Sequence, residues 1–233
     1  MDRFDPNKVE LFLDEYNTKE QSYLKRVIDN AVHIPNEELF NLLESALNDF
    51  HSHVNKYNLF LDPRKIGTEH WIFMELMKQQ SRFNLHPENV IHSQECPNDL
   101  PILIIDDAIY SSAHMCSIID SLQYYHGITV DFYCVAGVIS SYNCQVATEM
   151  GANIFAGKSY EHLTMAQLFP DLDYKLLDVL FPGHFNTCIP VFFNHKIANE
   201  FGCYQFFHKI ISKPISRRKI DQITLDDILR LSR

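Results

Sequence analysis

The sequence is poor in glycine and in clustered positive charge, and both shortages limit its function. It has 7 glycines among 233 residues, so long glycine-rich loops are excluded. Its 20 lysines and arginines against 30 aspartates and glutamates give a net charge of −10. Because nucleic acids bind basic surfaces, we expect no nucleic-acid partner. The dense basic cluster Arg217–Lys219 is followed by Asp221, Asp226 and Asp227, which is typical of a solvated tail.

The patterns of zinc, disulfide and membrane proteins are also missing. The six cysteines include no CxxC pair, and their scattered spacing predicts free thiols. The twelve histidines form no HExxH motif. No apolar run approaches the ~20 residues that span a bilayer, and the first residues lack the apolar core of a signal peptide. We therefore expect a soluble, cytoplasmic protein in a reducing compartment, with no membrane partner.

Helical spacing dominates the start of the chain. Apolar residues at 23–32 follow that spacing, and Thr18–Gln21 resembles a capping box that opens this helix. Asn36 is suited to cap a second helix, whose apolar stripe covers 39–50. We therefore predict an N-terminal helical segment, residues 1–55.

Strand and helix patterns then alternate. Apolar runs of strand length occur at 57–61, 89–92, 102–105, 130–139, 153–156, 176–181 and 188–193. Helical patterns occur at 68–80, 113–125, 141–150 and 197–211. This alternation predicts the α/β class, with a parallel sheet and flanking helices. We assign this domain to residues 56–212 and a C-terminal tail with a short helix to 213–233.

Two adjacent acids follow the strongest strand pattern. Asp106 and Asp107 come after four aliphatic residues, and ligands of parallel sheets bind at the carboxyl ends of strands. Ribose hydroxyls are suitable donors to this carboxylate pair, and a divalent ion is a suitable neighbour. Ser111 and Ser112 then open a helix, whose free N–H groups and dipole favour phosphate. The segment therefore predicts a site for a phosphorylated ribose.

Residues 102–115, ILIIDDAIYSSAHM, resemble the signature of type I phosphoribosyltransferases that binds 5-phosphoribosyl-1-pyrophosphate (PRPP). The resemblance implies that Asp106 and Asp107 bind the ribose 2′ and 3′ hydroxyls. It implies a 5′-phosphate site formed by Tyr110, Ser111, Ser112, Ala113 and His114. It also implies a Mg²⁺ cofactor that accompanies PRPP, with no direct metal ligand from the protein, and a C-terminal hood.

Two further segments take roles only through this resemblance. The segment 57–80 lies where the family keeps its pyrophosphate loop, and its candidate residues are Arg64, Lys65 and Gly67. The segment 189–199 lies at the place of the hood over the substrate base, and its candidates are Phe193, Asn194, His195 and Lys196. A strand that leaves the core into a turn explains the second segment equally well.

The chain departs from the family in its phosphate loop. Where the family has glycine and then threonine, this sequence has Ser112 and His114. Ser112 keeps a hydroxyl but adds a Cβ where the backbone approaches the phosphate. Whether the chain is an enzyme therefore stays open.

Three functions agree with the sequence. The first is a phosphoribosyltransferase that acts on a base or amine and releases pyrophosphate. The second is a non-catalytic regulatory module that binds PRPP or a nucleotide, and the third is an interaction scaffold without a ligand. An oligomer is compatible with each.

The motif ILIIDD also opens phosphorelay receiver domains. A receiver needs a further acid at a later strand end, near Ala152 and Asn153, where none stands. The residues Gly151–Lys158 resemble a receiver's closing lysine motif, but they come too early in the chain for it. The sequence therefore disfavours this assignment.

Overall fold

The structure is a computed structural model of the chain. It describes residues 4–62, 67–91, 99–109, 113–140, 148–149, 151–161, 168–169, 171, 173–180, 191–193 and 204–211. These residues form two compact units: one lies within Met1–Asn36 and Glu161–Ser216, and the other within Glu37–Tyr160. In the described part, no helix has both the length and the apolar character needed to cross a membrane.

The larger unit contains a five-stranded parallel sheet with the strand order β3-β2-β4-β5-β6. The strands are β2 (Asn58–Phe60), β3 (Asn89–Ile91), β4 (Ile102–Ile109), β5 (Phe132–Ser140) and β6 (Ala152–Tyr160). The predicted α/β class with a parallel sheet is confirmed. The chain passes from β2 outward to β3 and then returns to β4 on the other side of β2. This reversal is a topological switch point, where sheets of this kind bind ligands.

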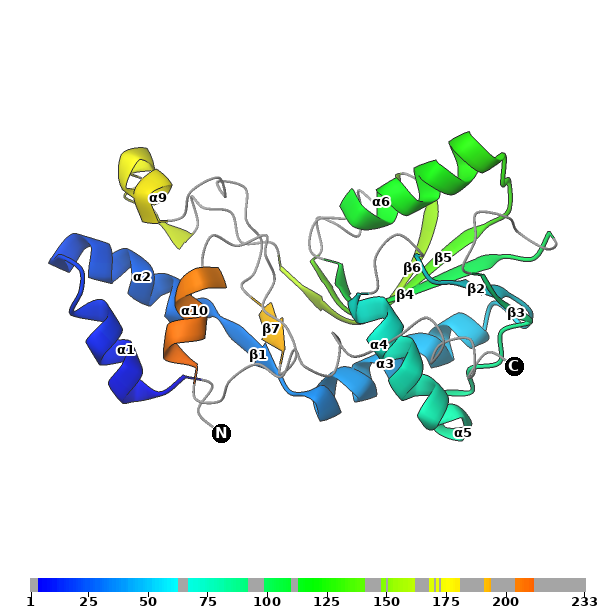
Figure 1. Cartoon of the computed structure of the whole chain (residues 1–233), viewed down its shortest axis with the longest axis horizontal. Helices are drawn as coiled ribbons and strands as arrows, with labels where there is room; N and C mark the ends of the chain where they lie inside the picture. Colours follow the sequence, from blue (N-terminus) through cyan, green and yellow to red (C-terminus); the bar gives the residue numbers. More distant parts are fainter. Residues whose placement is uncertain are drawn as a thin grey trace. The chain divides into compact units, whose positions relative to one another are not determined.

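Helices cover both faces of this sheet (Figure 1). One face carries α6 (Ala113–Asp120) and the π-helix η1 (Ser121–Tyr125). The other carries α3 (Asn36–His51) and α4 (Thr68–Lys78), which the short α5 (Gln80–Phe83) follows. The predicted helix 141–150 lies mostly outside the described residues, as does the whole tail 213–233.

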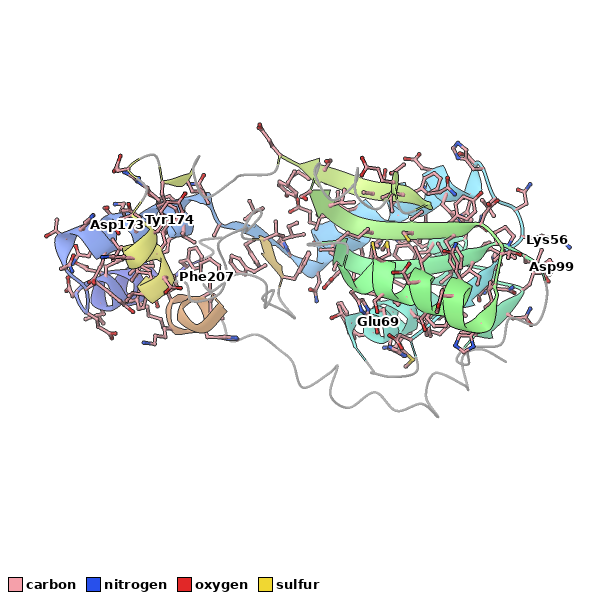
Figure 2. The ribbon with its side chains drawn as sticks, turned by 90° about the horizontal axis from the view of Figure 1, so that it is seen from above. Lys56, Glu69, Asp99, Asp173, Tyr174 and Phe207 are labelled. Atoms are coloured by element: carbon pink, nitrogen blue, oxygen red, sulfur yellow. The ribbon has the colours of Figure 1, made fainter. Side chains whose placement is uncertain are left out.

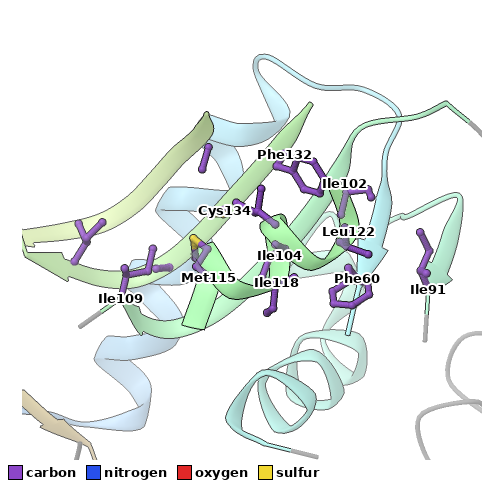
Figure 3. Close-up of a cluster of buried hydrophobic side chains, with 14 residues drawn as sticks. Phe60, Ile91, Ile102, Ile104, Ile109, Met115, Ile118, Leu122, Phe132 and Cys134 are labelled. Atoms are coloured by element: carbon purple, nitrogen blue, oxygen red, sulfur yellow. The ribbon is translucent and has the colours of Figure 1, made fainter. Parts of the chain in front are cut away.

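The core between α6 and the sheet is built by alternate residues of neighbouring strands (Figure 3). Ile102 and Ile104 of β4 lie beside Phe132 and Cys134 of β5 in the register of the sheet. The helical side of this cluster consists of Met115, Ile118, Ile119 and Leu122. Because successive strand residues face opposite sides, the intervening residues face α3 and α4.

On that second face, α3 approaches the sheet closely at two glycines. A Cβ at Gly157 would lie 2.6 Å from the Leu42 Cα atom, and one at Gly137 would overlap the Leu39 side chain. At the opposite end of the helix, the Phe50 ring packs edge-on against Tyr133 of β5, with ring centroids 5.6 Å apart. The first turn of α3 therefore lies at the carboxyl ends of β5 and β6.

The smaller unit pairs two strands that are far apart in the sequence. Its β1 (Val32–Ile34) is parallel to β7 (Val191–Phe193), in register from Val32 opposite Val191 to Ile34 opposite Phe193. The unit's helices are α1 (Pro6–Leu13), α2 (Thr18–Asn30), α9 (Tyr174–Leu180) and α10 (Tyr204–Ile210). The Phe4 ring stacks at 5.4 Å on both Phe192 and Phe207, which joins β7 to α10.

Several predicted boundaries are wrong. Residues 176–180, which were predicted as part of a strand, lie in helix α9, because the Asp173 side chain accepts a hydrogen bond from the Leu176 N–H and caps it. The capping box of α2 is formed by Asn17 and Glu20, one residue before the predicted box. Val32 begins β1 instead of completing the preceding helix.

The two units also do not follow the predicted segments. Helix α3 belongs to the unit of the sheet, whereas the predicted N-terminal segment extended to residue 55. The described residues after Tyr160 join the N-terminal helices instead of closing the sheet's own unit. The predicted division is wrong because β1 pairs with β7, and no local sequence pattern predicts this pairing.

Candidate functional site

Asp106 and Asp107 lie inside β4, which continues to Ile109 instead of ending before them. β2 pairs with the start of β4, at Ile102 and Leu103, whereas β5 pairs along β4 as far as Ile109. The two acids therefore lie beyond the part of β4 that β2 borders. This is the carboxyl end of the strand at the switch point, where the sequence predicted a ligand.

The two carboxylates face opposite sides of the sheet. Asp106 lies opposite Ala136, a member of the hydrophobic cluster between α6 and the sheet. Burial, then Cys116 and then the charge of Asp106 raise the pKa of the Cys134 thiol. Asp107 follows on the α3 side and has no exposed surface, whereas Asp106 is half-buried. Solvent therefore reaches Asp106 but not Asp107.

Backbone N–H groups orient both acids. Asp106 Oδ1 accepts a hydrogen bond from the Asp107 N–H at 2.8 Å, and Asp107 Oδ1 accepts one from the Ala108 N–H at 2.7 Å. The alternation of β4 slips by one residue after these positions, since Ile109 returns to the cluster that contains Ile104. At this local irregularity, each aspartate carboxylate accepts a hydrogen bond from the N–H of the next residue. These hydrogen bonds restrict the conformations of both side chains.

The start of α6 follows β4 directly. Ala113 is its first residue and His114 is exposed in its first turn. Tyr110, Ser111 and Ser112 lie outside the described residues. The start of this helix agrees with the predicted boundary.

The second switch-point strand, β2, leads to another helix start at the same edge. Asp62 lies just after β2 and is 4 % exposed, and Gly67 is the N-cap residue of α4. Arg64 and Lys65 lie outside the described residues. The sequence analysis missed Glu69 and His70, in the first turn of α4, whose side chains are 14 % and 1 % exposed. The sequence signal that could have identified them is a carboxylate and an imidazole shortly after the end of a predicted strand.

Of the predicted hood residues, Phe193 lies in the smaller unit. Phe193 ends β7 and has no exposed surface, so its ring cannot stack on a ligand while it stays in that core. Asn194, His195 and Lys196 lie outside the described residues.

Lys158 lies on the last strand of the sheet. Its ammonium nitrogen is 4.9 Å from the centre of the Tyr160 ring and 4.0 Å from Glu38 Oε1, and Tyr160 and then Glu38 raise its pKa. Since β4 is the third strand of this sheet in chain order, Lys158 does not come too early for a receiver's closing lysine. The sequence argument against a receiver assumed that ILIIDD was the first strand, and that assumption does not hold in this sheet.

Within the described ranges, no three His, Cys, Asp or Glu side chains gather closely enough to hold a metal ion. The described residues offer at this edge the accessible carboxylate of Asp106, the buried carboxylates of Asp62 and Asp107, and two helix starts after adjacent strands. Comparison of the chain with protein-family models, curated proteins and solved structures found no match.

Proposed function

We propose that the larger unit binds a phosphorylated ribose, with PRPP as the preferred ligand, at the carboxyl ends of β2 and β4. One observation carries this proposal: the two segments that the family resemblance selects follow adjacent strands that flank the switch point. Nothing in the composition required these distant segments to share one edge.

Asp106 is the residue assigned to the ribose hydroxyls, because its carboxylate is accessible and already oriented by the Asp107 N–H. The first N–H groups of α6 and the hydroxyls before it are assigned to the 5′-phosphate. Gly67 and its neighbours are assigned to the pyrophosphate. Asp107 stabilises the strand end from the inside.

The resemblance assigns Mg²⁺ to this site as a partner that PRPP brings. When bound, it would neutralise charge on the diphosphate, and the Asp106 carboxylate is an accessible hard oxygen donor at this edge. In phosphoribosyl transfer, the bond from C1 to the pyrophosphate oxygen breaks and a bond from C1 to the acceptor nitrogen forms. The protein's contribution is to position the sugar and to stabilise the charges that develop.

The same site suits a transferase or a binding module. Ser112 and His114, which differ from the family's phosphate loop, are the residues that favour the binding module. A transferase places an acceptor beside C1, whereas a module needs affinity for PRPP alone. Binding is therefore tested before turnover.

The test is a thermal melt with and without PRPP and Mg²⁺. A ligand present at ~100 times its Kd stabilises the folded state by about 2.7 kcal/mol. We expect a clear upward shift of Tm in the unmodified protein and none in Asp106→Asn, which keeps an oxygen acceptor for the Asp107 N–H. The control is Asp131→Asn, an exposed acid just before β5, at the opposite edge of the sheet. An unmodified protein that PRPP and nucleotides do not stabilise would remove the proposal.

A second function is favoured by the strand positions of Asp62, Asp106 and Lys158. In a receiver, acids at two strand ends and a lysine on the last strand form the phosphorylation site. Attack of the Asp106 carboxylate on acetyl phosphate would form an acyl phosphate and release acetate. A receiver predicts phosphoryl labelling of the protein by acetyl phosphate, whereas the PRPP site predicts none. Labelling that Asp106→Asn abolishes would favour the receiver over the PRPP site.

A further inference from the structure

Two groups at the start of α4, the Gly67 N–H and the Glu69 carboxylate, approach the same nitrogen atom, His70 Nδ1. The Gly67 N–H donates to His70 Nδ1 at 3.3 Å, and Glu69 Oε1 lies 3.3 Å from the same Nδ1. The Glu69 carboxylate also occupies the space beside Gly67, since a Cβ there would lie 2.7 Å from Oε2. Figure 2 labels Glu69 at this helix start. The imidazole is 1 % exposed, so bulk water does not substitute freely for these partners.

His70 Nδ1 cannot serve both partners in one protonation state. A neutral imidazole with its proton on Nε2 offers Nδ1 as an acceptor, which suits the Gly67 N–H. A protonated imidazole carries hydrogen on both nitrogens, so Nδ1 becomes a donor that suits the Glu69 carboxylate. Each state therefore satisfies one partner of Nδ1 and releases the other.

We propose that His70 is a positioning residue that acts as a proton switch, moving its Nδ1 hydrogen bond from Gly67 to Glu69 when it is protonated. Protonation frees the Gly67 N–H and adds positive charge beside it. This inference rests on the proposed function in one respect, namely that Gly67 faces the diphosphate of PRPP. An anion at Gly67 and a neutral His70 compete for the same N–H, so anion binding and protonation of His70 favour each other.

Charged groups lie on α4 and on the elements around it. Glu69 is on the helix itself, and the elements next to or packed against α4 contribute Asp62 after β2 and Asp106 and Asp107 on β4. Lys78 of α4 binds Glu75 at 2.7 Å, and Arg82 on α5 binds Glu44 of α3 at 2.7 Å.

The switch can be observed without a ligand. Glycine-selective ¹⁵N labelling gives at most 7 glycine amide signals, and Gly67→Ala identifies the one that belongs to Gly67. We expect this signal to move as the pH is lowered through the range in which His70 gains its proton. In His70→Asn, whose side-chain oxygen accepts from the N–H but does not titrate, the signal should stay constant. The control His86→Asn, at an exposed histidine, should behave as the unmodified protein. A Gly67 signal that titrates equally in His70→Asn would overturn the switch.

The coupling to ligand is tested by the Kd of Mg²⁺–PRPP at about pH 6 and pH 8. The phosphate of PRPP also titrates in this range, so the informative quantity is the change in Kd compared between the unmodified protein and His70→Asn. We expect the unmodified protein to favour the acidic side by about fivefold more than the variant. Equal changes in both proteins would refute the coupling and leave the PRPP site intact. A titrating Gly67 signal without any binding of PRPP or inorganic pyrophosphate would refute the coupling and the proposed function together.

Discussion

The close approach of α3 to β6 makes Gly157→Ala strongly destabilising. A new Cβ would lie 2.6 Å from the Leu42 Cα atom, where carbon atoms normally keep ~3.5 Å or more. The obstacle is helix backbone, which cannot rotate away as a side chain does. The helix must therefore move outward by about 1 Å, and such a gap forfeits a quarter to a half of the dispersion energy of each affected contact.

Helix α3 carries much of the core on this face. Its buried residues are Leu39, Phe40, Leu43, Ala46, Leu47 and Phe50. Overpacking in a filled core costs about 1 to 3 kcal/mol, and contact with backbone puts this position at the upper end, about 3 kcal/mol. Urea unfolding monitored by circular dichroism measures this loss.

The matched control is Gly151→Ala, just before the same strand. Gly151 has φ of +85°, and a Cβ added there would meet nothing within 4 Å, so its replacement costs only backbone strain, about 1 to 2 kcal/mol. Gly157→Ala should thus be the more harmful change, although it adds no left-handed strain. If the free energy of unfolding of Gly157→Ala lies within about 1 kcal/mol of that of the unmodified protein, α3 does not pack directly against the β6 backbone.

Two further predictions concern titratable groups. Burial raises the pKa of the Tyr57 phenol to about 12, so the folded state keeps a proton that the unfolded chain loses near pH ~10. The stability difference between the unmodified protein and Tyr57→Phe should be constant below pH ~10 and fall by about 2 to 3 kcal/mol towards pH ~12; a flat difference in urea unfolding would contradict this. The exposed pair of Lys19 Nζ and Asp173 Oδ2, at 2.6 Å, raises the pKa of Lys19 and lowers that of Asp173, yet Lys19→Ala should leave Tm unchanged at physiological salt. A fall in Tm that persists in about 1 M salt would refute this screening argument.

The five strands of the sheet were predictable because buried parallel strands are continuous apolar runs. Each of them overlaps an apolar run that the sequence analysis assigned to a strand. Two strands were predicted too short, β4 at Asp106 and β6 at Ala156, because polar residues were taken as strand ends. In this sheet the strands continue past those residues, and polar side chains occupy the carboxyl edge itself.

The strand pairing that holds the smaller unit together could not be predicted from local patterns. Its two strands have three residues each, and the partners Val32 and Val191 are too distant in sequence for any window to join them. The packing of Phe4, Phe192 and Phe207 stabilises this pairing, but aromatic residues are frequent throughout the chain. Only the three-dimensional contacts distinguish these rings from the others.

In the sequence motif, Asp106 and Asp107 look equivalent, but in β4 their side chains lie on opposite faces of the sheet. Because β4 continues through both residues, one carboxylate faces the α6 side with partial exposure, and the other is buried towards α3. Replacement of Asp107 changes a buried group that accepts the Ala108 N–H, so it acts on stability as well as on any ligand. Replacement of Asp106 alters an accessible acceptor at the switch point. Loss of ligand binding in the double variant would therefore not identify a site, and only the single Asp106→Asn change, in a protein that still melts cooperatively, assigns the ribose contact to this edge of the sheet.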